Sequence, residues 1–211
     1  MDRPLEGDRT AENATIDRLP LFPLHTVLFP GGVLPLHIFE ERYRTLIRED
    51  RDFGVVLIRE GREVNSIPEI HQVGTIALRE KVEEFEDGRF AVFCRGERRF
   101  RVLEVDASAP YLTATVEFLA DPEPAPESLT AALQSYLATR GVDVLIRHNE
   151  EIAATGAWLA GSVLEVEPVK LQRLLETGDA ELARRLLEGE SGRVRRLGRT
   201  SVVHPDLPSS N

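Results

Sequence analysis

The sequence has one cysteine, one methionine and one tryptophan among its 211 residues. A single cysteine, Cys94, excludes an internal disulfide and is typical of a reducing compartment. No apolar run approaches the roughly 18 residues that a membrane-spanning helix requires. Residues 1–13 are polar and lack the apolar segment of a secretion signal. We therefore expect a soluble, cytoplasmic protein that does not associate with membranes.

Positive charge is also scarce, because the sequence has 26 lysines and arginines but 36 acidic residues, which gives a net charge of −10. Such a chain repels nucleic-acid phosphates on average, although a local basic patch can still attract them. Residues 95–101 and 193–199 are the basic segments, and neither carries the several aromatic side chains of a base-stacking platform. The charge therefore disfavours nucleic acid as a partner, and RNA binding is kept as the alternative function.

Recognisable catalytic and metal-binding motifs are absent as well. The sequence has no Gly-x-Ser-x-Gly elbow and no phosphate-binding loop that ends in Gly-Lys-Ser or Gly-Lys-Thr. The histidines have no zinc-motif spacing to one another, to Cys94 or to carboxylates; they are His25, His37, His71, His148 and His204. Cys94 lies in an apolar run and is expected to be a buried, inert thiol. We expect no metal, no cofactor and no enzymatic activity, and an enzyme of unknown type ranks last.

Residues 29–43 combine a turn, an apolar ribbon and the start of a helix. Pro30-Gly31 suits a tight turn, and Pro35 within the following apolar run indicates an edge strand. A helical period then places one apolar stripe at Phe39, Tyr43, Leu46 and Ile47. This junction is expected to fix the topology of the N-terminal domain, and its helix is expected to end near residues 50–52.

Strand patterns dominate residues 19–120. Short apolar or alternating runs occur at residues 19–24, 53–58, 73–85, 89–95, 97–105 and 111–119. Asp87-Gly88 predicts a hairpin with a type I′ turn, and Gly96 is expected to end its second strand. Consecutive strands joined by short turns favour antiparallel pairing, and closure into a barrel would remove exposed edges.

Helical patterns follow a proline-rich linker at residues 121–127. Helices are predicted at residues 128–140, capped by Ser128, within 150–163, from Pro168 to Gly178, and from Asp179 onward. None can bury its apolar stripe alone, so residues 128–188 are expected to form a helical bundle. Residues 1–18 and 189–211 are predicted to be flexible tails.

Several motifs occur in an order that resembles the N-terminal domain of Lon proteases, a module also embedded in cereblon. The residues that carry the resemblance are Leu19-Pro20-Leu21-Phe22-Pro23-Leu24, Phe29-Pro30-Gly31, Pro35-Leu36-His37-Ile38-Phe39-Glu40, Arg42-Tyr43, Phe53-Gly54-Val55-Val56-Leu57, Val73-Gly74-Thr75, Asp87-Gly88-Arg89-Phe90, Arg95-Gly96, Arg99-Phe100, Pro110-Tyr111 and Lys170-Leu171-Gln172-Arg173-Leu174-Leu175-Glu176. The resemblance covers residues 19–187. It implies an α+β fold: a PUA-like antiparallel β-barrel or pseudobarrel with one early helix, followed by a C-terminal α-helical bundle.

The resemblance also implies a function, namely a stand-alone, non-catalytic substrate-recognition module without ATPase or peptidase domains. Its expected partners are unfolded polypeptide segments or a partner protein, with a possible link to proteolysis or chaperones. The candidate binding residues are Leu36, His37, Phe39, Glu40, Arg42, Tyr43 and Arg99. The same residues also suit structural roles, since Glu40 and Arg42 can satisfy buried strand ends beside a packed turn.

Overall fold

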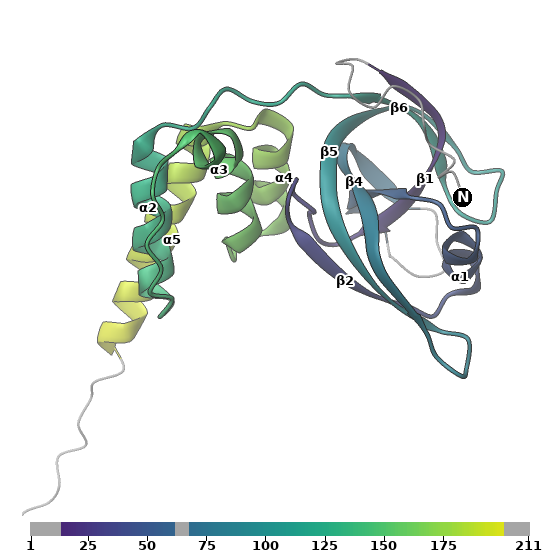
Figure 1. The fold of residues 1–211 in the computed structure, drawn as a ribbon, viewed down its shortest axis with the longest axis horizontal. Coiled ribbons are helices and arrows are strands. Elements are labelled where there is room, and N and C mark those ends of the chain that lie inside the picture. The colour runs from purple at the N-terminus through teal and green to yellow at the C-terminus, as the bar shows by residue number, and fades with distance from the viewer. Residues whose placement is uncertain (1–13, 62–67, 201–211) are drawn as a thin grey trace, which may run out of the picture.

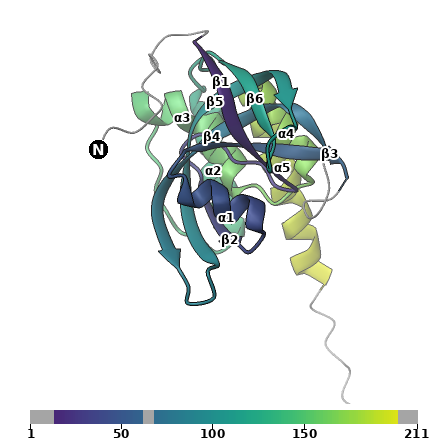
Figure 2. The same ribbon diagram turned by 90° about the vertical axis from the view of Figure 1, so that its right-hand side faces the viewer.

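The computed structural model describes all residues except 1–13, 62–67 and 201–211. Its strands are β1 (Thr15–Leu24), β2 (Val33–Ile38), β3 (Phe53–Glu60), β4 (Glu69–Glu84), β5 (Phe90–Asp106) and β6 (Thr113–Phe118). Its helices are α1 (Glu41–Arg48), α2 (Glu127–Thr139), α3 (Glu150–Val163), α4 (Pro168–Thr177) and α5 (Ala180–Thr200). Figure 1 shows the strands and α1 on one side of the molecule and the other helices on the opposite side, and in the view of Figure 2 the strands and α1 lie in front of the other helices. The predicted α+β fold is confirmed.

The strands form one sheet in the order β2-β5-β4-β3-β1-β6, and β5 also pairs with β6. This extra pairing closes a ring that runs from β5 through β4, β3, β1 and β6 back to β5 (Figure 1). Strand β5 can serve three neighbours because it is long. Residues 90–95 pair with β2, residues 90–101 with β4 and residues 100–106 with β6.

One pairing differs from the antiparallel pattern that the sequence predicted. Strands β1 and β3 are parallel, with Leu21 opposite Gly54 and Leu24 opposite Leu57. A parallel pair requires a crossover of about a dozen residues or more. The segment that contains β2 and α1 supplies this crossover, because β2 leaves β1 and pairs with β5.

The β4–β5 hairpin is present, but its turn is not the predicted type I′. Gly88 has a φ of 76°, whereas Asp87 is not among the described residues with positive φ. The backbone N–H of Gly88 donates to the carbonyl of Phe85 at 2.8 Å, and that of Phe85 donates to Arg89 at 2.8 Å. This is a three-residue loop in which only the glycine needs the left-handed conformation.

The sequence suggested that Gly96 ends its strand. In the structure Gly96 instead lies within β5. A Cβ atom at Gly96 would lie 2.1 Å from the carbonyl oxygen of Phe29. The backbone N–H of Gly96 also donates to Gly32 at 2.8 Å, and Gly31 donates back to Gly96 at 2.8 Å. The glycine therefore lets the turn after Phe29 approach the strand closely.

Helix α1 buries Tyr43, Leu46 and Ile47, as its stripe predicted, but begins later than expected. Phe39 precedes the helix and is 52% exposed, so its predicted place on the buried stripe is wrong. The reason is the extended backbone of Glu40, with φ −73° and ψ 135°, which directs the preceding residue away from the helical path.

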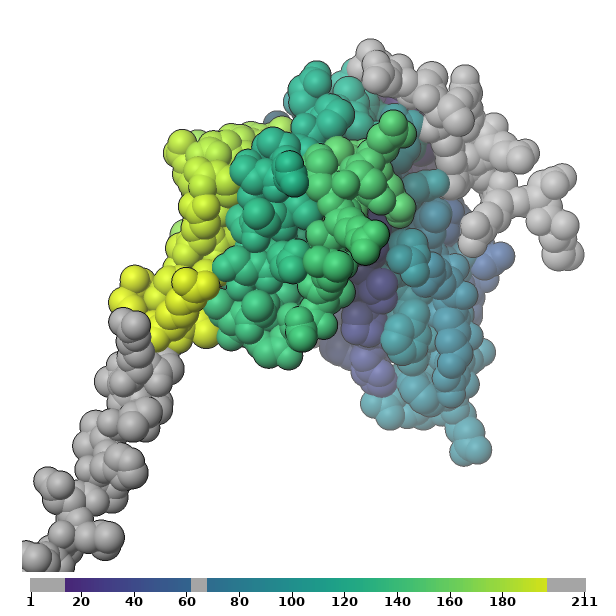
Figure 3. All heavy atoms as spheres, turned by 60° about the vertical axis from the view of Figure 1, so that its left-hand side comes forward, coloured from purple at the N-terminus to yellow at the C-terminus, as the bar shows by residue number. Residues whose placement is uncertain are grey.

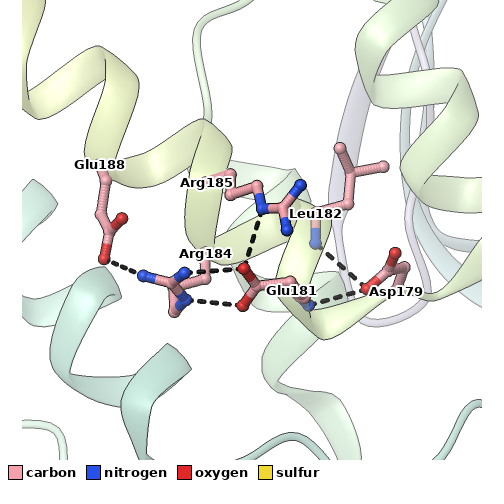
Figure 4. A network of polar contacts seen from close by, with 6 residues as sticks. All are labelled: Asp179, Glu181, Leu182, Arg184, Arg185 and Glu188. Atoms are coloured by element: carbon pink, nitrogen blue, oxygen red, sulfur yellow. Dashed lines mark hydrogen bonds and ion pairs between the residues drawn. The ribbon is translucent and has the colours of Figure 1, made fainter.

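The bundle helices follow the predicted pattern except at one cap. Helix α2 begins after Pro126 without a side-chain cap, so the predicted role of Ser128 is wrong. Asp179 caps α5 as predicted, because its Oδ1 accepts from the N–H of Glu181 at 2.8 Å and of Leu182 at 3.1 Å. Figure 4 shows this cap beside ion pairs that join Glu181 and Glu188 to Arg184.

The predicted tails are shorter in the structure. Residues 15–18 belong to β1, and α5 continues to Thr200, so residues 189–200 are helical. The i,i+3 ion pair between Arg193 and Glu190, at 2.7 Å, stabilises this part of the helix. The other residues of the predicted tails, 1–13 and 201–211, lie outside the described residues.

The barrel and the bundle share a core. Phe29 and Val73, from the barrel segment of the chain, belong to the same buried cluster as Leu133, Trp158 and Leu174 of the bundle. The linker is packed too, since Ala125 is buried and its N–H donates to the carbonyl of Ala153 at 2.6 Å. The linker therefore connects two units that fold against each other.

Candidate functional site

Most of the residues predicted to bind a partner lie together beside the free edge of β2. Leu36, His37, Phe39, Glu40 and Tyr43 line a pocket of about 200 Å³ between β2, the end of β1 and the start of α1. Arg42 joins this group because it donates to the Glu40 carboxylate at 3.0 Å. Arg99 is separate and lies at the contact between the barrel and the bundle.

Exposed apolar side chains cover the outer face of β2 and the β4–β5 hairpin, which Figure 1 shows extending beyond the barrel. Pro35 pairs with Phe93 and His37 with Ala91, so these side chains share one face. The His37 ring lies 6.4 Å from Phe39 and 6.0 Å from Phe85. We define the hairpin face by its exposed members Val33, His37, Phe39, Phe85 and Phe93.

Polar contacts hold the hairpin face in place around His37. The guanidinium of Arg89 lies 3.2 Å from the Nε2 of His37 and also donates to Asp87 at 2.7 Å. The backbone N–H and guanidinium of Arg89 hold the pKa of Asp87 below its usual range. His37 therefore contacts a cation and two aromatic rings, which suits a structural or binding role better than that of a general base.

Two other predicted residues, Glu40 and Tyr43, line the pocket, and Arg42 contacts both. Tyr43 is 4% exposed and stacks on Phe22 with ring centroids 4.1 Å apart. The Arg42 guanidinium lies over the Tyr43 ring at 4.6 Å while it pairs with Glu40. These contacts hold the Tyr43 ring in place. The main role of Tyr43 is therefore packing within the chain rather than contact with a partner.

Arg99 joins the barrel to the bundle. Its guanidinium donates to the carbonyl of Leu175 at 2.7 Å and of Glu176 at 3.3 Å, which both lie in the last turn of α4. It also donates to Ala120 and lies 4.6 Å from the Trp158 ring centroid. Burial lowers the pKa of Arg99, while the charge of Asp121 opposes this effect. Arg99 thus neutralises the negative end of α4 and stabilises the interface.

The basic segment at residues 95–101 is mostly occupied by contacts within the chain. Arg95 forms an ion pair with Glu80, Arg98 lies 4.5 Å from the Phe118 ring, and Arg99 is buried. Arg101 remains exposed on β5. The segment at residues 95–101 therefore does not form the continuous charged surface that a nucleic acid would contact.

A larger pocket, of about 600 Å³, lies between the barrel and the bundle. The turn at Pro30, the middle of β5, the linker and one face of α3 line it, and Trp158 forms part of its wall. Sequence reasoning missed this pocket, because its walls come from four segments that are far apart in the chain. Two signals were available in the sequence. The prolines of the linker were interpreted as a spacer, and the single tryptophan was given no role.

Within the part of the chain that the structure describes, no group of three or more His, Cys, Asp or Glu side chains is placed to hold a metal ion. Burial raises the pKa of the Cys94 thiol to about 12, so the thiol is not an activated nucleophile. None of the described helices has the length and apolar character that a membrane span requires.

Comparison with known proteins identifies the family. Residues 18–187 match the family described as the ATP-dependent protease La (LON) substrate-binding domain. Lon protease 2 of Herpetosiphon aurantiacus is 30% identical over 197 residues, which are 85% of this chain and 24% of that protein. Lon protease of Flavobacterium johnsoniae is 34% identical over 112 residues, 50% of this chain and 14% of that protein. The chain therefore spans about a quarter or less of the length of these relatives.

Solved structures show the same fold. The Lon N-terminal domain protein from Xanthomonas campestris is 30% identical, with a TM-score of 0.58, and the match covers 84% of this chain and 98% of that one. The N-terminal domain of Mycobacterium avium complex Lon protease has a TM-score of 0.61 at 19% identity, covering 85% of this chain and 98% of that one. The second likeness concerns the fold alone.

Proposed function

The chain belongs to the LON substrate-binding domain family, and from this premise we propose that it is a non-catalytic module that binds polypeptide segments of partner proteins. The relatives' names describe proteases, whereas this chain resembles only a region of each. The sequence contains neither a phosphate-binding loop nor a recognisable catalytic motif. The proposal therefore concerns recognition and assigns no hydrolysis to these residues.

The hairpin face is the observation that carries the proposal. Phe39 is 52% exposed, Phe93 is 42% exposed and Phe85 is 38% exposed. Soluble proteins seldom leave several aromatic side chains exposed together unless the surface binds something. An unfolded segment can cover such a surface with its own apolar side chains, which a folded polar surface cannot do.

The free edge of β2 gives a second reason to expect an extended polypeptide. Strand β2 stands at one end of the sheet order and pairs only with β5 among the described strands. Edge strands can add a strand from another chain through backbone hydrogen bonds, with side-chain pockets providing selectivity. The pocket beside Leu36 and Phe39 lies along this edge and can receive one side chain of such a segment.

Binding of a permanently unfolded polypeptide tests the proposal. The probe is a reduced, carboxymethylated and fluorescently labelled model protein, and fluorescence anisotropy measures its affinity. The double variant Phe39→Ser, Phe93→Ser removes two exposed rings, so we expect at least about tenfold weaker binding with little change in thermal stability.

A matched control replaces Leu103 and Val105, which are 55% and 44% exposed on β5 outside the hairpin face, with serine. This control should bind the probe as the original chain does. Equal affinity of all three proteins would show that the hairpin face is not the binding surface. Failure of the original chain to bind any unfolded probe would contradict the proposed function itself.

A further inference from the structure

The pocket between the barrel and the bundle has the dimensions of a ligand site. Its volume of about 600 Å³ lies in the range of roughly 300–1,000 Å³ that is common for binding pockets. Figure 3 shows the side of the molecule where the bundle, in green and yellow, lies against the blue and purple barrel. None of the residues predicted from the sequence to bind a partner lines this pocket, so it is a separate candidate site.

Small side chains on α3 create the space. Ala154 and Thr155 line the pocket and are exposed, as is Ser162, which lies about two helical turns further along the same side of the helix. Leu159 and the buried ring of Trp158 lie on this face too. Opposite them, Pro30 and the linker prolines present apolar rings without backbone N–H groups. The walls are therefore mainly apolar and suit an aliphatic or aromatic side chain.

The charged residues around these walls are mostly acidic. Glu97, Asp121 and Glu151 line the pocket with carboxylates, and Arg98 is the cation among the lining residues. The Arg98 guanidinium lies over the Phe118 ring, 4.5 Å from its centroid. The formal charge of the lining is thus negative, which favours a cationic occupant and repels an acidic one.

We propose that this pocket is a second recognition site, which binds a polypeptide segment with a bulky apolar side chain flanked by lysine or arginine. The apolar side chain would lie against Trp158 and Leu159, and the flanking cations would face Glu97, Asp121 and Glu151. The inference rests on the proposed function, because it takes the partner to be a polypeptide. It adds a charge preference and a location distinct from the hairpin face.

Trp158 makes the site directly observable, because it is the only tryptophan in the sequence. Its ring contacts Arg99 and Phe29, so its emission reports on this interface. Tryptophan-free peptides provide the test, each with a central leucine or phenylalanine flanked by lysine, glutamate or serine. We expect the lysine-flanked peptides to change the Trp158 emission and to bind more weakly as the salt concentration rises.

Two variants examine the walls and the charge separately. Thr155→Phe fills the space with a ring at an exposed helical position, and we expect the lysine-flanked peptide to lose at least about tenfold in affinity. Glu151→Lys reverses one charge of the lining, and a loss of about tenfold is expected for this peptide. Glu150→Lys is the matched control: the same change at the neighbouring exposed residue, outside the lining, should cost less than about threefold.

The outcomes separate this inference from the proposed function. Loss of lysine-flanked peptide binding in Thr155→Phe and Glu151→Lys, but not in Phe39→Ser, Phe93→Ser, supports a second site. Loss only in the hairpin-face variant overturns the second site and leaves the proposed function in place. Equal binding of lysine- and glutamate-flanked peptides also overturns it. If Thr155→Phe alters only the self-association of the chain in analytical ultracentrifugation, the pocket is a contact between copies, and the inference fails.

Discussion

Arg99 illustrates how much one side chain contributes to the arrangement of this molecule. It was predicted to bind a partner, whereas its hydrogen bonds go to the end of α4 and to Ala120, directly before the linker. Lysine carries the same charge but cannot hold several carbonyl oxygens with a planar group. We expect Arg99→Lys to destabilise the protein by about 2 kcal/mol, measured by urea denaturation. Arg101→Lys, at an exposed position of the same strand, is the control and should be neutral.

Cys94 provides a prediction about pH. Burial raises its pKa from 9.0 to about 12, so the folded protein retains the neutral thiol where the unfolded chain ionises. This contribution to stability is therefore complete below pH 9 and is lost as the pH rises towards 12. A thiol reagent at mildly alkaline pH should label the native protein far more slowly than the denatured protein. Equal labelling rates would show that the thiol is accessible.

Individual residues were only partly predictable from the sequence. The stripe of α1 identified Tyr43 and Leu46 as buried, since helical periodicity needs only local information. Phe39 shares that period but is exposed, because the backbone at Glu40 is extended. The periodicity of the sequence gives no information about the backbone angles of Glu40. The predicted site residues around β2 came together because they are also close in sequence.

At the scale of elements, Phe29 of the barrel packs against α3 at a glycine. A Cβ atom at Gly161 would lie 2.4 Å from a ring carbon of Phe29. Gly161→Ala should therefore destabilise the protein by about 1–3 kcal/mol, in spite of the higher helix propensity of alanine. In the matched control Gly189→Ala, nothing lies within 4 Å of the new atom, and we expect stabilisation of about 0.5–1 kcal/mol. Thermal denaturation of both variants measures the difference.

Element prediction succeeded where local chemistry decides the boundary. Asp179 and Gly178 mark the junction of α4 and α5, because one caps a helix and the other adopts a positive φ of 64°. Element prediction failed at Gly96 and for residues 189–200, where the glycines suggested that the strand and the helix end. Gly96 is needed for the close approach of another segment, and that segment cannot be inferred from the neighbouring residues.

At the scale of the whole molecule, we expect thermal stability to depend on the contact between the barrel and the bundle. A chain that ends at residue 120 lacks the bundle cluster around Phe29 and Val73 and the α4 carbonyls that Arg99 contacts. Such a truncated barrel should melt at a lower temperature than the full chain and bind a hydrophobic dye such as ANS. Circular dichroism and dye fluorescence measure these effects. Melting at the same temperature, with no dye binding, would show that the barrel is independent of the bundle.

The sequence predicted both units but not their mutual packing. Proline enrichment in residues 121–127 suggested a spacer, since prolines keep a chain extended. Ala125 is nevertheless buried, and a Cβ at Gly178 would lie 2.5 Å from Pro122. Extended linkers and packed ones have the same composition, so the difference depends on surfaces that only the folded chain presents.

The position of Phe29 also has a consequence for synthesis on the ribosome. This aromatic residue is made early, whereas Trp158 and Gly161, which bury it, follow only after more than half of the chain has been added. At about 5–20 residues per second, the interval is on the order of ten seconds. During that time the nascent barrel presents an unburied ring, and a ribosome-associated chaperone would meet it before α3 does.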